Sequence, residues 1–276
     1  MASPDQPPPQ AAHHELRTAR NSAGYLLEAL ELLHKVNPRI TLLDVGAGSG
    51  SISATLAREL QPDGRVIATD VNPDILERAR TVAEAAGVTN IDFQQADVLG
   101  RLPFDDATFD VTHCHQVLTH LPHPVDALRE MLRVTKPGGI VAAREGDLET
   151  ECVWPELPGM VKFHALTANF IKLAGGTSKA GRQLLSWALQ VGSGVHRDQI
   201  TPSFGTWCYY DSTERKIWAQ AMVDQLRIGR LREIGLAAGL GTEDDLEEMA
   251  TAWEEWSESD EAILGMMHGE ILIRKK

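Results

Sequence analysis

The sequence predicts an α/β fold with a mostly parallel sheet, because short apolar runs alternate with helical segments through the first half of the chain. Apolar residues at helical spacing predict the connecting helices, such as Leu128, Met131 and Leu132 on one face of a helix. Residues 40–45 form a mostly apolar run that is expected as a buried parallel strand, and four further strands are expected at residues 65–69, 91–93, 109–114 and 140–143. Helices are expected between strands at residues 51–60, 73–86 and 125–134.

A tail and a helix are expected before the first strand. Residues 1–12 are rich in proline and are expected to form a disordered tail. Leucines at helical spacing predict a helix from His13 to Lys35. We expect residues 13–276 to form a single domain, with a core at 13–147 followed by a helical and antiparallel part at 148–276.

After residue 147 the alternation stops. Residues 148–192 and 211–262 read as helical insertions that form a lid over the core. Residues 200–210 and 268–274 have strand character and are expected to pair as a C-terminal antiparallel hairpin. The expected architecture is therefore a parallel sheet with an antiparallel hairpin at its end.

Composition excludes several functional classes. The 26 Lys and Arg residues against 39 Asp and Glu residues give a net charge of −13, which disfavours nucleic acid and anionic membrane surfaces as partners. No apolar run approaches the roughly 18 residues of a membrane span, and no secretion-signal pattern is seen. The three cysteines, Cys114, Cys152 and Cys208, are expected as buried thiols in a cytoplasmic protein.

A glycine-rich loop follows the first expected strand. Residues 43–50 read Leu-Asp-Val-Gly-Ala-Gly-Ser-Gly, at the junction with a helix whose free N–H groups can bind a ligand. Three acids, Asp44, Asp70 and Asp97, come at the ends of three successive strands. Because ligands bind at the carboxyl edge of such sheets, these acids predict a shared binding site, with Asp70 placed to accept hydrogen bonds from ribose hydroxyls.

A dinucleotide-dependent oxidoreductase is the natural alternative. Its G-x-G-x-x-G fingerprint requires a third glycine where this chain has Ser51. The acid before the glycines, Asp44, would also sit badly beside a pyrophosphate and would suit a ligand that carries an ammonium group.

These motifs resemble those of class I S-adenosylmethionine-dependent methyltransferases, in the branch of the UbiE quinone C-methyltransferases. The resemblance covers about residues 14–147 and includes Leu121-Pro122 and the run Lys136-Pro137-Gly138-Gly139. It implies a Rossmann-like fold, S-adenosylmethionine as cofactor, and methyl transfer to a small molecule. We expect this molecule to be hydrophobic, because the expected lid is rich in Trp, Leu and Met. The chain departs from the quinone enzymes beyond residue 150, so the resemblance does not imply a quinone substrate. A catalytically silent regulator that binds the same cofactor is a further alternative.

The resemblance also implies a role for individual residues of the cofactor site. Loop residues hold the amino-acid part of the cofactor, Asp70 holds the ribose hydroxyls, and residues after the second and third strands surround the adenine. His115 and Gln116 follow the fourth strand and face the sulfonium, and an N-terminal helix covers the methionine end. The expected cofactor-binding residues are Arg17, Thr18, Asp44, Gly46, Ala47, Gly48, Gly50, Asp70, Val71, Asn72, Asp97, Val98, His115 and Gln116.

A dense group of histidines lies around the fourth strand. His113, His115, His120 and His123 lack cysteine or acidic partners in the pattern, so we expect site lining and packing, and no metal. His115 is the candidate catalytic residue, either as a general base with an ordinary pKa near 6.5 or as a hydrogen-bonding group. The hydrogen-bonding role is the favoured one.

Overall fold

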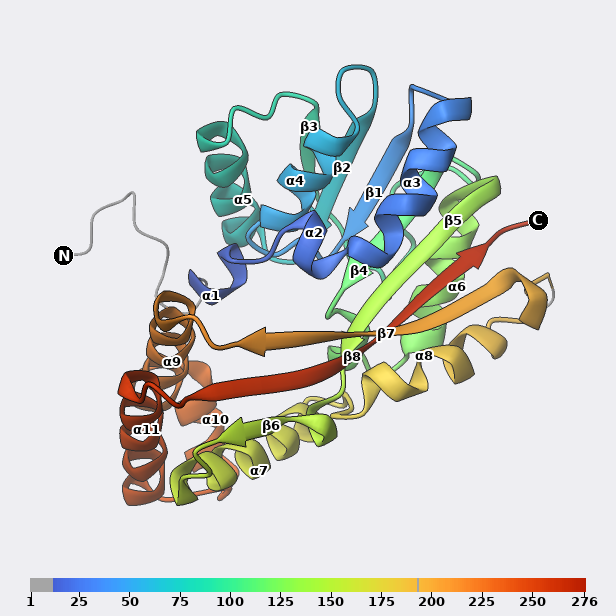
Figure 1. Ribbon diagram of the computed structural model, residues 1–276. Helices are drawn as coiled ribbons and strands as arrows, with labels where there is room; N and C mark the ends of the chain where they lie inside the picture. Colours follow the sequence, from blue (N-terminus) through green and yellow to red (C-terminus); the bar gives the residue numbers. More distant parts are fainter. Residues whose placement is uncertain (1–11, 193) are drawn as a thin grey trace.

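The computed structural model describes residues 12–192 and 194–276, which form an eight-stranded sheet with helices on its faces (Figure 1). The strand order is β3-β2-β1-β4-β5-β8-β6, and β7 also pairs with β8. The strands are β1 (Thr41–Val45), β2 (Arg65–Asp70), β3 (Ile91–Gln95), β4 (Phe109–His115), β5 (Thr135–Gly146), β6 (Cys152–Trp154), β7 (Ile200–Tyr209) and β8 (Ile263–Arg274).

The five strands of the first half pair in parallel, which confirms the predicted fold class. Their order places β1 at the centre, where β2 pairs with one edge and β4 with the other. The chain therefore crosses from one side of β1 to the other between β3 and β4. The crevice at the carboxyl ends of β1 and β4 is where ligands bind in sheets of this kind.

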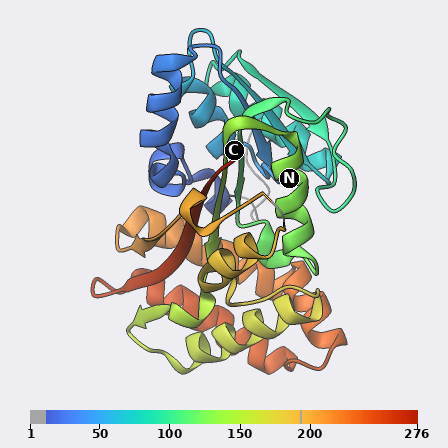
Figure 2. The same ribbon diagram turned by 90° about the vertical axis from the view of Figure 1, so that its right-hand side faces the viewer.

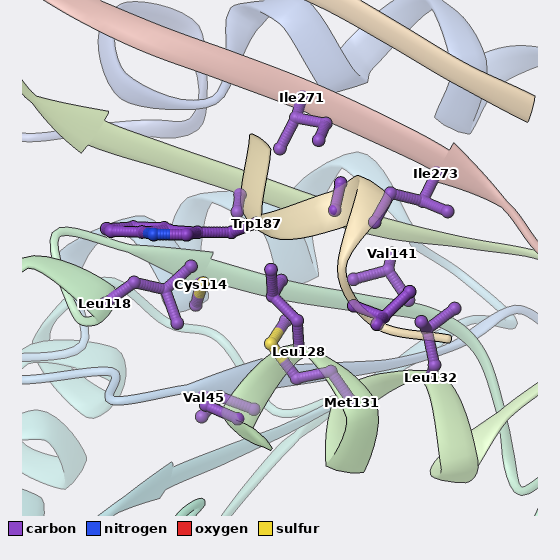
Figure 3. Close-up of a cluster of buried hydrophobic side chains, with 14 of the residues drawn as sticks. Val45, Cys114, Leu118, Leu128, Met131, Leu132, Val141, Trp187, Ile271 and Ile273 are labelled. Carbon is purple, nitrogen blue, oxygen red and sulfur yellow. The ribbon is translucent and has the colours of Figure 1, made fainter. Parts of the chain in front are cut away.

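Helices cover both faces of the parallel sheet. One face carries α3 (Gly24–Val36), α4 (Ser51–Glu59) and α5 (Pro73–Ala85), whose apolar residues share a buried cluster with β1 and β2. The other face carries α6 (Pro124–Val134) and α8 (Ala180–Leu189). Figure 3 shows this second cluster, in which α6 and Trp187 of α8 face side chains of the strands: Val45, Cys114, Val141, Ile271 and Ile273.

A second group of helices lies beyond the core and forms its own apolar cluster (Figure 2). It consists of α7 (Pro158–Leu173), α9 (Ser212–Arg227), α10 (Arg230–Ala237) and α11 (Glu243–Glu258). These helices pack on one face of β7 and the first half of β8 through residues such as Trp207 and Leu264. The helical regions expected at 148–192 and 211–262 are thus present, with β6 added at the start of the first.

The helix expected from His13 to Lys35 is wrong as a single element. The chain forms α1 (Ala12–Glu15), α2 (Ala19–Ser22) and α3 in its place. Thr18 adopts an extended conformation and its side chain accepts a hydrogen bond from the Asn21 backbone N–H, while the Asn21 side chain accepts one from the Thr18 N–H. This reciprocal cap starts a new helix and outweighs the continuous helical spacing of the apolar residues.

The C-terminal strands pair as predicted, although they are not a tight hairpin. β7 and β8 are antiparallel, with Ile200 opposite Ile273 and Tyr209 opposite Leu264, but α9, α10 and α11 connect them. β8 begins at Ile263, five residues before the expected start, because its first half pairs with β6 and β7.

The prediction of three buried thiols is wrong for two of them. Cys114 is buried, whereas Cys152 and Cys208 are exposed. Both pair in register with Gly265 of β8, so they share one face of the sheet. Helices α7, α9, α10 and α11 pack on the opposite face, where Trp207 is buried.

The expected tail at 1–12 lies outside the described residues except for its last residue, which begins α1. A single sheet contains strands of both the core and the C-terminal part. The expected boundary between these two parts at residue 147 stays a prediction. Among residues 12–192 and 194–276, no helix combines the length and apolar character needed to cross a bilayer.

Candidate active site

The glycine loop turns sharply between β1 and α4. Gly46 and Gly48 both have positive φ angles, +68° and +55°, which favour glycine over other residues. A Cβ at Gly46 would collide with Val117, so this glycine is required by packing. A Cβ at Gly48 would meet nothing within 4 Å among the described atoms and would project into open space. Gly48 is therefore the loop position where the backbone is free to contact a ligand.

Asp70 fastens the loop to the end of β2. One carboxylate oxygen accepts a hydrogen bond from the Gly48 N–H at 3.0 Å, and the other accepts one from the Asn72 N–H at 3.0 Å. An ionised carboxylate has about four lone-pair sites, so each oxygen of Asp70 keeps acceptor capacity. The half-buried side chain can still accept hydrogen bonds from a ligand's hydroxyl groups.

Asp44 is held from inside the protein. One oxygen lies 2.7 Å from Nδ1 of His113, and the other accepts a hydrogen bond from the Ser53 hydroxyl at 2.5 Å. The His113 contact follows from the strand register, which places Asp44 directly opposite His113 on β4. Asp44 is 2% exposed and is one of the residues that line a cavity beside the loop.

Two cavities meet at the carboxyl edge of the sheet. The loop cavity, about 170 Å³, is lined by His14, Arg17, Asp44, Gly46, Ala47, Gly48, Ser49, Ser51, Ile52, His115 and Gln116. The strand-end cavity, about 230 Å³, is lined by Val45, Gly46, Asp70, Val71, Ala96, Asp97, Val98, Gln116, Val117, His120 and Leu121. Gly46 and Gln116 line both cavities, so the two cavities are adjacent.

A third cavity of about 230 Å³ lies between the carboxyl edge of the parallel sheet and helices α7, α9 and α11. Most of this aromatic cavity is apolar and comes from residues past 145: Gly146, Leu148, Phe163, Ile171, Trp207, Trp218, Met222, Trp253 and Met266. Its polar lining consists of His13, His14, Arg17, Gln116, Thr119, His120, Glu151 and Thr167. His14, Arg17 and Gln116 also line the loop cavity, so these three residues form the junction between the two cavities.

Half-buried Arg17 and buried His115 lie close together beside this junction. The Arg17 guanidinium lies 4.7 Å from the ring centroid of Trp207, and the His115 ring lies 5.7 Å from the same tryptophan. Burial, together with the charges of Arg17 and Arg144, lowers the pKa of His115 well below its usual 6.5. His115 is therefore neutral at pH 7 and a weak proton acceptor, which favours its hydrogen-bonding role. Within the described residues neither of its ring nitrogens has a hydrogen-bond partner.

The structure brings most of the expected cofactor residues to the two adjacent cavities. Eleven of the fourteen expected residues line one or both of these cavities: Arg17, Asp44, Gly46, Ala47, Gly48, Asp70, Val71, Asp97, Val98, His115 and Gln116. Among the described residues, Thr18, Gly50 and Asn72 fall outside these linings, and all three occupy helix N-caps. Their expected contact with the cofactor stays a prediction.

Sequence reasoning missed most of the aromatic cavity. Phe163 lies on α7, Trp253 on α11 and Met266 on β8, while Glu151 lies in the connection before β6, and no spacing in the sequence links them. The concentration of all six tryptophans beyond residue 150 was the one available signal.

The histidine group does not assemble into a metal site. His113 contacts Asp44 and His115 lines the loop cavity, whereas His120 lies on the turn after β4. Among residues 12–192 and 194–276, no three His, Cys, Asp or Glu side chains are arranged to hold a metal ion.

Comparisons with known proteins agree with this fold and site. Residues 37–186 match the family described as a methyltransferase domain. An uncharacterised methyltransferase of Schizosaccharomyces pombe is 32% identical, over 96% of this chain and 93% of that protein. The UbiE ubiquinone/menaquinone biosynthesis C-methyltransferase of Ectopseudomonas mendocina is 36% identical, over 52% of this chain and 54% of its own length.

Solved structures share the fold at low sequence identity. The YcgJ protein of Bacillus subtilis has a TM-score of 0.54 with 17% identity, over 92% of this chain and 99% of that one. The [4+2]-cyclase SpnF has a TM-score of 0.54 with 21% identity, over 95% of this chain and 84% of that one.

The parallel sheet, the glycine loop and these relatives define a class I S-adenosylmethionine-dependent methyltransferase. The chain belongs to the methyltransferase domain family and is an enzyme that uses S-adenosylmethionine as its cofactor. This finding decides against the dinucleotide-dependent oxidoreductase and the catalytically silent regulator as readings of the same loop.

Proposed function

We propose that the enzyme transfers a methyl group from S-adenosylmethionine to a small, largely apolar molecule held in the aromatic cavity. The observation that carries this proposal is the junction of the loop cavity with the aromatic cavity at His14, Arg17 and Gln116. A methyl group presented at this junction would face an acceptor directly. The aromatic cavity is concave and holds about 230 Å³ between the core and the C-terminal helices, which suits a small molecule better than a polymer.

The adjacent loop and strand-end cavities fit the cofactor. The open space at Gly48 lets the amino-acid part approach the backbone, and the free lone pairs of Asp70 suit the two ribose hydroxyls. Asp97 and Val98 line the strand-end cavity, where they would hold the adenine. When bound, the cofactor supplies a methyl group already activated by the positive sulfur.

The remaining contribution of the chain is positioning. Arg17 and Gln116 line both sides of the junction and would fix the direction of approach of the acceptor. Correct orientation of two reactants can lower a barrier by roughly 7–11 kcal/mol. Exclusion of water from the cavity when the acceptor is bound would favour a reaction in which positive charge on sulfur is lost.

Transfer of a labelled methyl group to extracted metabolites tests this function. The enzyme would be incubated with methyl-labelled S-adenosylmethionine and a cell extract, and label would be measured in organic-soluble molecules, protein and nucleic acid. We expect label in the organic-soluble fraction, together with formation of S-adenosylhomocysteine. Label in protein or nucleic acid instead would contradict the small-molecule acceptor, and binding of the cofactor without any transfer would contradict the proposed reaction.

A further inference from the structure

Gln116, directly after β4, has a backbone conformation that is unusual for its residue type. Its φ angle is +54°, in the left-handed region that residues other than glycine, asparagine and aspartate rarely adopt. Such strain persists where the surroundings determine the conformation, and it gathers at functional sites. Gln116 also lines all three cavities, so the strained residue lies where cofactor and acceptor would meet.

Strand β5 fixes the backbone of Gln116 and of the residues after it. Glu145 on β5 is fully buried. Three consecutive backbone N–H groups donate to its two carboxylate oxygens at 2.9–3.1 Å: those of Val117, Leu118 and Thr119. The Gln116 N–H donates to the Arg144 carbonyl at 2.8 Å. Four successive N–H groups are thus held by two residues of β5, which accounts for the strained conformation of Gln116.

The Gln116 side chain contacts a histidine that lies outside the linings of the three cavities. His268 on β8 is fully buried, and its Nε2 lies 3.1 Å from Nε2 of Gln116. The other ring nitrogen, Nδ1, lies 3.3 Å from the Met266 carbonyl oxygen. A carbonyl oxygen can only accept, so Nδ1 carries the ring proton. A Cβ at Gly146 would lie 3.1 Å from Nε2 of Gln116, so this glycine leaves room for the contact.

The protonation state of His268 decides which end of the Gln116 amide faces it. Burial, together with the charges of Arg144 and Arg17, lowers the pKa of His268 to about 3, so the ring is neutral at pH 7. With its proton on Nδ1, the ring offers only a lone pair at Nε2. The NH₂ group of Gln116 therefore faces His268 and donates to it. The amide oxygen, Oε1, accepts no hydrogen bond from the described residues and is not buried, so it is the polar atom that this side chain offers to a ligand.

We infer that Gln116 presents its amide oxygen to the methyl-bearing sulfur of the cofactor, and that His268 is the positioning residue that turns the amide this way. This inference rests on the proposed function, which places that sulfur at the junction lined by Arg17 and Gln116. A positive sulfur beside the Arg17 guanidinium needs an oxygen of opposite polarity close by, and an oriented amide dipole supplies one. The same oxygen can accept weak C–H···O contacts from the methyl hydrogens, which would hold the methyl group in one direction.

Two cofactor analogues isolate the contribution of the Gln116 oxygen. Sinefungin carries an ammonium group in place of the methyl group of S-adenosylmethionine, whereas S-adenosylhomocysteine carries neither. Calorimetry with both ligands gives an affinity ratio, sinefungin over S-adenosylhomocysteine, for each protein. The Arg17 charge is present in every protein, so its repulsion of the ammonium group cancels when the ratios are compared. The ratio should fall about tenfold or more in Gln116→Leu, because a hydrogen bond from a charged donor is lost.

Gln199→Leu is the matched control for this variant. Gln199 is buried, and its amide donates to the Arg274 carbonyl at 2.9 Å and accepts from the His196 N–H at 2.7 Å, outside the three cavities. Because these contacts are independent of the site, the ratio should stay within about twofold of the wild type.

Gln116→Asn keeps the test decisive if Gln116→Leu does not fold. Asparagine tolerates the left-handed conformation, but its side chain is one methylene shorter, so the oxygen is withdrawn and the ratio should also fall. An unchanged ratio in a folded Gln116 variant would overturn the contact. Wild-type enzyme that binds S-adenosylhomocysteine but not sinefungin would overturn it as well.

The orienting role is tested with His268→Phe and His268→Gln. Phenylalanine keeps a ring but removes the Nε2 acceptor, so the Gln116 amide is free to turn and the ratio should fall about threefold to tenfold. Glutamine can place an oxygen where Nε2 lies, and the ratio should stay within about twofold of the wild type. Both variants alter a buried residue and should lose melting temperature, whereas only His268→Phe should lose the ratio. Equal ratios in the two His268 variants would overturn the positioning role.

The label-transfer experiment separates failure of this inference from failure of the proposed function. If the wild type methylates organic-soluble molecules while the affinity ratio is the same in every variant, only the roles of Gln116 and His268 are overturned. If the label from the cofactor reaches only protein or nucleic acid, the proposed function itself is overturned.

Discussion

Replacing Asp70 with asparagine removes the negative charge that the account assigns to the ribose. The Asp70→Asn side chain has nearly the same shape, but one oxygen becomes an NH₂ group that can only donate. Both oxygens of Asp70 now accept backbone hydrogen bonds, from Gly48 and from Asn72. After the substitution, the new NH₂ group faces one of these backbone N–H groups, and neither of the two can accept a hydrogen bond. A single neutral oxygen is left for the two ribose hydroxyls.

The expected loss follows from the hydrogen bonds concerned. A hydrogen bond to a charged group contributes about 1.5–3 kcal/mol, and a neutral one about 0.5–1.5 kcal/mol. Losing one charged bond and weakening the other costs about 3 kcal/mol. Since about 1.4 kcal/mol corresponds to tenfold in affinity, Asp70→Asn should weaken cofactor binding about 10²-fold.

Isothermal titration of S-adenosylhomocysteine into each variant measures this loss. Asp74→Asn is the matched control, because Asp74 carries the same charge in the first turn of α5 but is exposed and outside the cavity linings described here. The control should bind within about threefold of the wild type. Wild-type affinity in a folded Asp70→Asn variant, judged by circular dichroism, would refute the assignment of Asp70 to the ribose.

Three further predictions concern the loop, a close packing contact and the pH dependence of stability. Gly48→Val should abolish cofactor binding in calorimetry and keep the helical content, since its side chain would fill the loop cavity at a φ of +55°; normal binding would show the loop is misread. Gly269→Ala should lower the free energy of unfolding in urea by about 3 kcal/mol, because its Cβ would collide with the Gly181 backbone of α8; an unchanged transition would refute this contact. Burial lowers the pKa of His13 and His268 to about 3, so the folded protein keeps both imidazoles neutral down to that pH. Because the unfolded chain protonates them below pH 6.5, each histidine lowers the free energy of unfolding by about 1.4 kcal/mol per pH unit between pH 6.5 and pH 3. Burial also raises the pKa of Glu145 to about 7, which opposes this loss between pH 4.5 and 7, so the melting temperature should fall most steeply below pH 4.5; a flat profile there would contradict the buried histidines.

The first half of the fold could be predicted because local and global signals agree there. The central strand β1 is a short, mostly apolar run that ends at a glycine, with Val45 before Gly46. Asn72 and Pro73 mark the start of α5 in the sequence, and the structure confirms that the Asn72 side chain caps that helix. The glycine loop could be located because its spacing is set by backbone geometry within eight residues.

Contacts between distant segments could not be predicted in the same way. The pairing of Asp44 with His113 depends on strand register, and the aromatic cavity depends on how α7 and α11 pack over β7. The cap at Thr18 shows a local signal that the regular leucine spacing concealed. The exposure of Cys152 follows from an uncovered sheet face, which no local pattern reveals.

A crystal structure of the complex with S-adenosylhomocysteine tests the central claim most directly. The account predicts the ribose hydroxyls on Asp70, the adenine beside Asp97, and the sulfur at the junction between Arg17 and Gln116, facing the aromatic cavity. A ligand bound elsewhere, or a sulfur atom turned away from that junction, would contradict it.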